Sequence, residues 1–130
     1  MLAFIFGTSL LAFAQKTPPQ AVATTFHQKF PDVKAPKWGQ EKNGEWEAEF
    51  DRGNAEMSAN FNAAGQWLET ETEINVSDLP APVQAALKGK KVKEAAKIVR
   101  ADGSTVYEAE VRRHDMVFDA NGKLLSEEKD

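Results

Sequence analysis

The chain has 130 residues, of which 42% are hydrophobic and 28% charged, and its formal net charge is −4. This length suits one compact domain or two very small ones. The negative balance disfavours binding to nucleic acid or anionic lipid, because such binding depends on contacts from Lys and Arg to phosphate. The chain has no cysteine, which excludes disulfides and zinc–thiolate sites. We expect a protein without a cofactor that is stabilised by core packing.

The first fourteen residues are predicted to be a secretion signal. Residues 1–13 are almost wholly apolar and too short for a permanent membrane anchor, and Ala12 and Ala14 are the small residues that signal peptidase prefers. No Lys or Arg precedes this run, so either the true start lies upstream of Met1 or the signal is atypical. A buried N-terminal strand or helix is the alternative. The pattern predicts cleavage after Ala14 and a periplasmic or secreted protein, with no membrane-spanning segment in the mature chain.

The remainder of the chain contains an internal repeat. Residues 19–26 match 80–87, residues 46–50 match 107–111, and residues 61–68 match 118–125, in the same order and with offsets of 61, 61 and 57 positions. The second copy is four residues shorter around 112–114, an even loss that keeps every side chain on its original strand face. We predict one structural domain made of a first repeat over 15–75 and a second over 76–130.

Each copy begins with a predicted helix. Thr17 and the two prolines after it are typical of a helix start, and Pro31 ends the helix. In the second copy Pro80 lies in the first turn, and Gly89 ends the helix. The apolar stripes of the two helices consist of Val22, Phe26 and Phe30, and of Val83, Ala86 and Leu87.

Each helix is followed by segments in which apolar and polar residues alternate, which predicts strands with one buried face. Pairs such as Asn43-Gly44 and Asn121-Gly122 separate these segments with turns. The predicted fold is therefore α+β: two tandem α-β-β-β-β repeats forming two layers, with one antiparallel sheet of about eight strands and the helices on one face. We expect Trp46 to pack against Phe26, and its counterpart Tyr107 to pack under Leu87.

The sheet face away from the helices is predicted to be charged and open to solvent. Lysines and arginines from neighbouring strands are expected to be interleaved with its acids. The expected acids are Glu45, Glu47, Glu49, Glu56, Glu108 and Glu110.

Three of these segments resemble the PepSY-like family of bacterial periplasmic proteins, whose fold is similar to that of the beta-lactamase inhibitor protein. They are the helix start at Leu79-Pro80, the strand over 46–50, and the hairpin over 118–125 with its F-D-x-x-G-K-hydrophobic-L pattern. The resemblance covers roughly residues 18–128. It implies an exported protein with no enzymatic role that binds or inhibits other proteins, including peptidases, and it supplies no catalytic residues.

The residues themselves also argue against an enzyme. The chain has no nucleophilic Gly-x-Ser-x-Gly motif and no phosphate-binding glycine loop, and its two histidines occur in different contexts. Glu69, Glu71 and Glu73 alternate, and Asp119 to Gly122 is faintly similar to a calcium loop, although a hairpin turn explains that segment better. A weak calcium- or small-ligand-binding stress protein is therefore the alternative to a protein-binding module. We predict no catalytic and no metal-binding residues.

The candidate partner-binding residues are two tryptophans and a basic hairpin. An exposed Trp among charges is a common anchor of protein interfaces. Partial burial at the margin of the sheet is the competing interpretation for both tryptophans. The candidates are Trp38, Trp67, Arg112, Arg113 and His114. The sequence does not indicate the partner or the oligomeric state.

Overall fold

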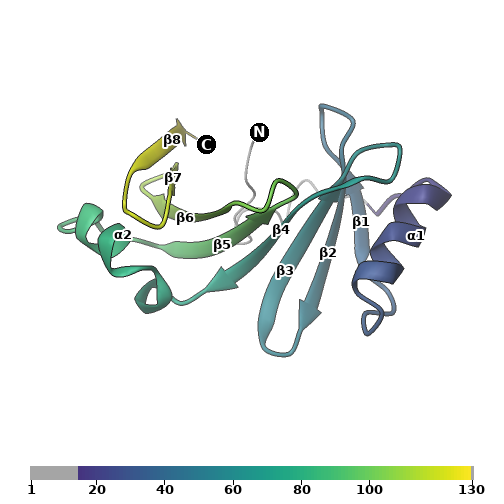
Figure 1. Cartoon of the computed structure of the whole chain (residues 1–130), viewed down its shortest axis with the longest axis horizontal. Helices are drawn as coiled ribbons and strands as arrows, with labels where there is room; N and C mark the ends of the chain where they lie inside the picture. The colour runs from purple at the N-terminus through teal and green to yellow at the C-terminus, as the bar shows by residue number, and fades with distance from the viewer. Residues whose placement is uncertain (1–14, 130) are drawn as a thin grey trace.

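The structure, a computed structural model, describes residues 15–129. They form one antiparallel sheet of eight strands, with both helices on the outer side of its bend (Figure 1). The predicted α+β fold is thus confirmed. The predicted secretion signal lies outside the described residues. Within residues 15–129, no helix has the length and apolar character needed to cross a membrane.

The elements follow one another as helix, four strands, helix and four strands. The first run contains α1 (Gln20–Lys29), β1 (Lys37–Gln40), β2 (Trp46–Arg52), β3 (Ala55–Phe61) and β4 (Trp67–Ile74). A short 3-10 helix, η2 (Val76–Asp78), precedes α2 (Ala81–Ala86). The second run continues with β5 (Glu94–Arg100), β6 (Thr105–Val111), β7 (His114–Phe118) and β8 (Leu124–Lys129). This order matches the predicted one; the duplication that would explain it stays a prediction.

The strands lie in the sheet in the order in which they occur in the sequence, from β1 to β8. Each strand therefore pairs with its neighbour in the chain, and only the connection from β4 to β5 contains helices. Trp46 pairs with Phe61 in the first run, and Tyr107 pairs with Phe118 in the second. The two aromatic positions that align in the sequence thus occupy equivalent places in the sheet.

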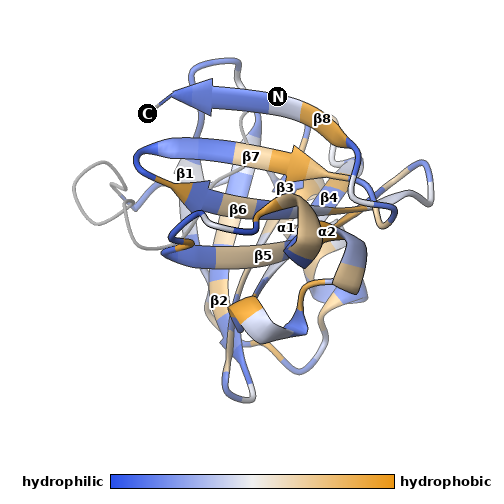
Figure 2. Ribbon diagram, turned by 90° about the vertical axis from the view of Figure 1, so that its left-hand side faces the viewer, coloured by the Kyte–Doolittle hydropathy of each residue, from blue (hydrophilic) through white to orange (hydrophobic). Residues whose placement is uncertain are grey.

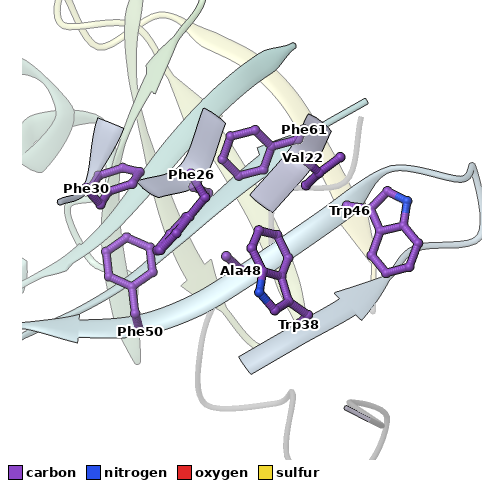
Figure 3. Close-up of a cluster of buried hydrophobic side chains, with 9 residues drawn as sticks. Val22, Phe26, Phe30, Trp38, Trp46, Ala48, Phe50 and Phe61 are labelled. Carbon is purple, nitrogen blue, oxygen red and sulfur yellow. The ribbon is translucent and has the colours of Figure 1, made fainter. Parts of the chain in front are cut away.

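The first core lies between α1 and strands β1 to β3 (Figure 3). Phe26 is fully buried at its centre, and its ring lies 5.4 Å from Trp38 and 5.2 Å from Phe50. Trp46 belongs to the same cluster, but the tryptophan ring that meets Phe26 is that of Trp38. Edge-on contacts of this kind add to the stabilisation from burial alone.

A second core lies between α2 and strands β5 to β7. Leu79, Val83 and Leu87 from the α2 region contact Ala109 and Phe118 of the sheet, among other apolar residues. Tyr107 is half-buried and packs against this cluster, which also contains Leu87. Because both cores use the same face of the sheet, the opposite face has no helix over it in the described part of the chain.

Candidate interaction surface

The strand pairing sorts the charged side chains between the two faces of the sheet. Directly opposite residues share a face, so the face away from the helices can be followed from strand to strand. Every strand from β2 to β8 contributes a carboxylate to this face, which we call the acidic face. It comprises Glu47, Glu49, Asp51, Glu56, Glu69, Glu71, Glu73, Glu94, Glu108, Glu110, Asp115 and Glu128.

Within the strands, only two basic residues share this face. Lys37 lies opposite Glu49, and Arg100 lies opposite Glu69. The expected interleaving with lysines and arginines from neighbouring strands is therefore limited to these two residues. Arg52 and Lys97 alternate onto the helix side, where Arg52 lies beside the Phe30 ring. The face is nearly uniform in charge because the other basic residues of the strands occupy the alternate positions, whose side chains lie on the helix side.

The acidic face has a buried centre and accessible margins. Glu47, Glu71 and Glu108 expose only 1–2% of their surface. Asp51 and Glu56, at the end of the β2–β3 hairpin, are exposed. A partner would therefore meet the marginal carboxylates directly, whereas the central carboxyl groups have almost no surface to offer.

Burial and mutual repulsion raise the pKa values of the central carboxyl groups. The pKa of Glu47 rises to about 8, first because of burial and then because Glu41 and Glu49 are close. Burial likewise raises the pKa of Glu69 to about 7, although the Arg100 guanidinium opposes this shift from 3.8 Å away. These groups hold protons at a pH at which an ordinary carboxyl group is ionised.

Two further carboxyl groups on this face have raised pKa values. Burial, the nearby charge of Glu108 and a hydrogen bond to it raise the pKa of Glu71 well above its usual value. Burial and a hydrogen bond to Glu56 raise the pKa of Glu73 to about 7. Both Glu71 and Glu73 therefore favour the protonated form more than an ordinary carboxyl group does.

The described residues provide no metal centre. No group of three or more His, Asp or Glu residues among positions 15–129 is arranged to hold a metal ion. Asp119 uses one carboxylate oxygen to accept hydrogen bonds from the backbone N–H groups of Asn121 and Lys123, at 2.9 and 3.0 Å. This segment is therefore a hairpin turn of the ordinary Asx type.

The structure separates the predicted partner-binding residues into two groups. Trp38 is only 6% exposed in the core under α1, so it has almost no surface to offer to a partner. Trp67 is half-buried on the same side of the sheet, where the Lys29 ammonium lies 3.6 Å from its ring centroid and its indole N–H donates to Thr70. Both tryptophans lie away from the acidic face.

The other three predicted residues lie in the second half of the chain. Arg112 and Arg113 form the exposed turn between β6 and β7, and the His114 Nδ1 atom lies 2.9 Å from a carboxylate oxygen of Glu127. The structure thus does not bring them together with Trp38 and Trp67. Their role in partner binding stays a prediction. The acidic face could have been found more completely from the sequence by extending the alternation through β4, β5 and β7.

Comparison with known proteins identifies relatives by sequence and by fold. The family model described as "Putative beta-lactamase-inhibitor-like, PepSY-like" matches residues 44–126. The structure is similar to that of a DUF2874 family protein from Bacteroides ovatus, with a TM-score of 0.78, 22% identity, and coverage of 87% of this chain and 88% of the other. The chain matches no curated protein.

Two further solved structures show the same fold. A BLIP-like protein from Bacteroides fragilis has a TM-score of 0.73 and 26% identity, with 88% of each chain covered. A structure from Bacteroides eggerthii, described as "putative periplasmic proteins", has a TM-score of 0.79 and 15% identity, covering 87% of this chain and 89% of the other. The likeness therefore spans nearly all of the described residues.

Proposed function

Because this chain belongs to the PepSY-like family, we propose that it is a non-catalytic, exported protein that binds another envelope protein, such as a peptidase, through its acidic face. The family and the fold resemble beta-lactamase-inhibitor-like proteins. The relative from Bacteroides eggerthii is described as periplasmic, which supports the proposed location. Inhibition of the partner is part of this proposal.

The observation that carries the proposal is the segregation of charge across the sheet. Carboxylates from seven adjacent strands share one face with only Lys37 and Arg100 as basic residues of the strands. Burial of these carboxyl groups, together with the crowding of like charge around them, raises the pKa values of Glu47 and Glu69 and costs folding free energy when the groups are ionised. A surface that is unfavourable for the protein alone is typical of a binding surface.

The partner should present a segment rich in Lys and Arg. Electrostatic complementarity of this kind accelerates association and selects against acidic partners. Three apolar side chains, Ile98, Val106 and Val117, form a small cluster on the same face among the carboxylates. These three side chains are almost completely buried, so the cluster stabilises the sheet and the exposed carboxylates remain the part of the face that meets a partner.

The proposal is tested by affinity capture from envelope extract at low salt. The wild-type protein should retain one partner in stoichiometric amount, and Asp51→Asn/Glu56→Gln should retain at least fivefold less. Asp51 and Glu56 are exposed and directly opposite each other, so their neutralisation removes a repulsion and should not unfold the protein. Retention should also fall as salt is raised, because exposed charges are screened.

The matched control removes two negative charges that lie outside the acidic face. Asp32→Asn/Glu127→Gln affects two exposed carboxylates that pair with Arg52 and His114 respectively, and it should retain the partner as the wild type does. If the control loses the partner and the acidic-face variant keeps it, the proposed surface is wrong. Failure to capture any protein at micromolar concentration would overturn the binding function itself.

A further inference from the structure

A second charged surface lies on the helix side of the sheet, at the end where β5 begins. Three segments that are distant in the sequence meet there: the approach to β5, the β6–β7 turn and the end of β8, which share the left side of Figure 2. Glu94 pairs with Glu110, and His114 pairs with both Val111 and Lys129, which fixes this arrangement. Six basic residues of these segments form a patch that we call the basic corner. It comprises Lys90, Lys91, Lys93, Arg112, Arg113 and Lys129.

These six side chains are exposed, and none of them forms an ion pair within the described part of the chain. Glu94, whose charge interacts with that of Lys93, faces the other side of the sheet, and Glu127 pairs with His114. Lys93 alternates with Ala95 and so lies on the helix side, as does Lys129 opposite His114. The sheet therefore separates a basic corner from the acidic face, although the net charge of the whole chain is −4.

The backbone of the β6–β7 turn indicates that its two arginines are kept at a cost in stability. Arg112 and Arg113 have φ angles of 50° and 66°, in the left-handed region, and they are the only non-glycine residues with positive φ among those described. The other described positive-φ positions are occupied by glycine, for example Gly44 and Gly103. A side chain at such a position costs about 1 kcal/mol relative to glycine.

An exposed apolar residue lies at the same end of the sheet. Val76 follows β4, whose last residue, Ile74, pairs with Ala95 at the start of β5. Its side chain is 37% exposed. Basic residues combined with an accessible apolar side chain are typical of proteins that bind at the surface of a bilayer.

We propose that the basic corner binds the surface of an anionic lipid bilayer. The cations come from three segments at the surface, and they are all accessible, which suits an extended array of phosphate groups better than one enclosed ion. Val76 adds an apolar contact that a free phosphate ion would not use. Because the acidic face points away from the corner, repulsion from the bilayer orients the molecule with this corner toward the lipid.

The test is co-sedimentation of the purified protein with vesicles of phosphatidylglycerol and phosphatidylethanolamine, compared with vesicles of phosphatidylcholine alone. Each basic residue at an anionic surface contributes about fivefold to binding, so Arg112→Asn/Arg113→Gly should bind anionic vesicles about 30-fold more weakly. Asn-Gly is the favoured sequence for a turn with two positive φ angles, so this variant should fold at least as well as the wild type. Lost binding would therefore not result from unfolding.

The matched control is Lys34→Gln/Lys42→Gln, which removes two exposed lysines from loops of the first half and should bind vesicles as the wild type does. Val76→Ser should weaken binding to anionic vesicles without changing the salt dependence. Equal binding to both vesicle types, or equal binding by the two double variants, would overturn the proposal. Inhibition by millimolar inorganic phosphate would assign the corner to free phosphate instead, and binding of polyglutamate but not vesicles would assign it to an acidic protein.

Discussion

Gly65 lies so close to α1 that a Cβ atom added to it would be 2.7 Å from the carbonyl oxygen of Ala21. The same relationship recurs in the second half, where a Cβ atom on Gly122 would be 2.5 Å from the carbonyl oxygen of Pro82. Both glycines have positive φ, at 90° and 86°. The β3–β4 turn therefore packs directly against α1, and the β7–β8 turn packs against α2. Only glycine fits at these two points of contact.

Substituting either glycine should destabilise the protein more than substituting an open turn glycine. Gly65→Ala and Gly122→Ala combine a left-handed backbone with a steric clash, so each should lower the free energy of unfolding by about 3 kcal/mol. Gly103→Ala is the control, because its φ is 88° but nothing lies within 4 Å of the added atom. That variant should lose only about 1 kcal/mol in urea denaturation. Equal losses for all three would show that the helix contact is unimportant.

Phe26→Ala should be among the most destabilising substitutions in the first half. The ring is fully buried and lies 5.2 Å from the rings of Phe30 and Phe50. Its removal leaves a cavity and costs about 3–5 kcal/mol. Leu124→Ala, at a side chain that is 44% exposed, should cost less than about 1 kcal/mol. Thermal unfolding of the two variants provides the comparison, and similar melting temperatures would contradict the assigned core.

Stability should decrease as pH rises from about 5 to 8. The pKa of Glu47 is about 8 in the folded protein and that of Glu69 about 7, against an ordinary value of 4.5. Over this window the unfolded chain has already released protons that the folded chain still holds, so raising the pH favours unfolding. The stabilisation that comes from the raised pKa values in the folded protein is fully present below pH 4.5, and it is lost above pH 8. Urea denaturation at several pH values measures the slope.

The groups that face Glu47 and Glu69 determine how steep this dependence is. The charged groups that act on them are Glu41, Glu45, Glu49 and Arg100, with Glu69 also acting on Glu47. Glu47→Gln should flatten the dependence and raise stability at pH 8 by about 2 kcal/mol, because an amide needs no deprotonation in a buried site. An unchanged slope in this variant would show that other groups titrate.

The charge-free turn variant Arg112→Asn/Arg113→Gly should be more stable than the wild type by about 1–2 kcal/mol. Its backbone needs positive φ at both positions, which glycine and asparagine tolerate better than arginine. The midpoint of urea denaturation should rise, and the slope should not change. The same substitutions at a turn of ordinary geometry would lower stability, so a lower midpoint would contradict the left-handed conformation.

Sequence patterns predicted the fold well because the alternation is strong and local. The apolar triplets Trp46-Ala48-Phe50 and Tyr107-Ala109-Val111 fixed which face each central strand buries, and glycine-containing pairs located the turns. The pairing between strands was harder to predict, because a shift of one residue would move each side chain to the opposite face of the sheet. A bulge between Asn60 and Phe61 lets Trp67 pair with Phe61 and Glu69 with Asn60, so that both Trp67 and Leu68 avoid the acidic face.

The charged surfaces were only partly predictable for the same reason. Lys93 and Glu94 are neighbours in the sequence but face opposite sides of the sheet, so counting charges along the chain hides their separation. The net charge of −4 predicted weak attraction to anionic lipid, an average that conceals the basic corner. Trp38 is a candidate interface residue in the sequence because it lies among charged residues, whereas its pairing with Ala48 directs it into the core.

The sequential order of the strands bears on how the protein reaches its folded state. Every hairpin closes a short loop, and only the step from β4 to β5 must enclose the nineteen residues between Ile74 and Glu94, including α2. Short loops close fast and long loops close slowly during folding. The hairpins of each half should therefore form before the two halves pair along Ile74 and Ala95. A chain that emerges gradually, N-terminus first, can thus acquire structure in the order in which its strands appear.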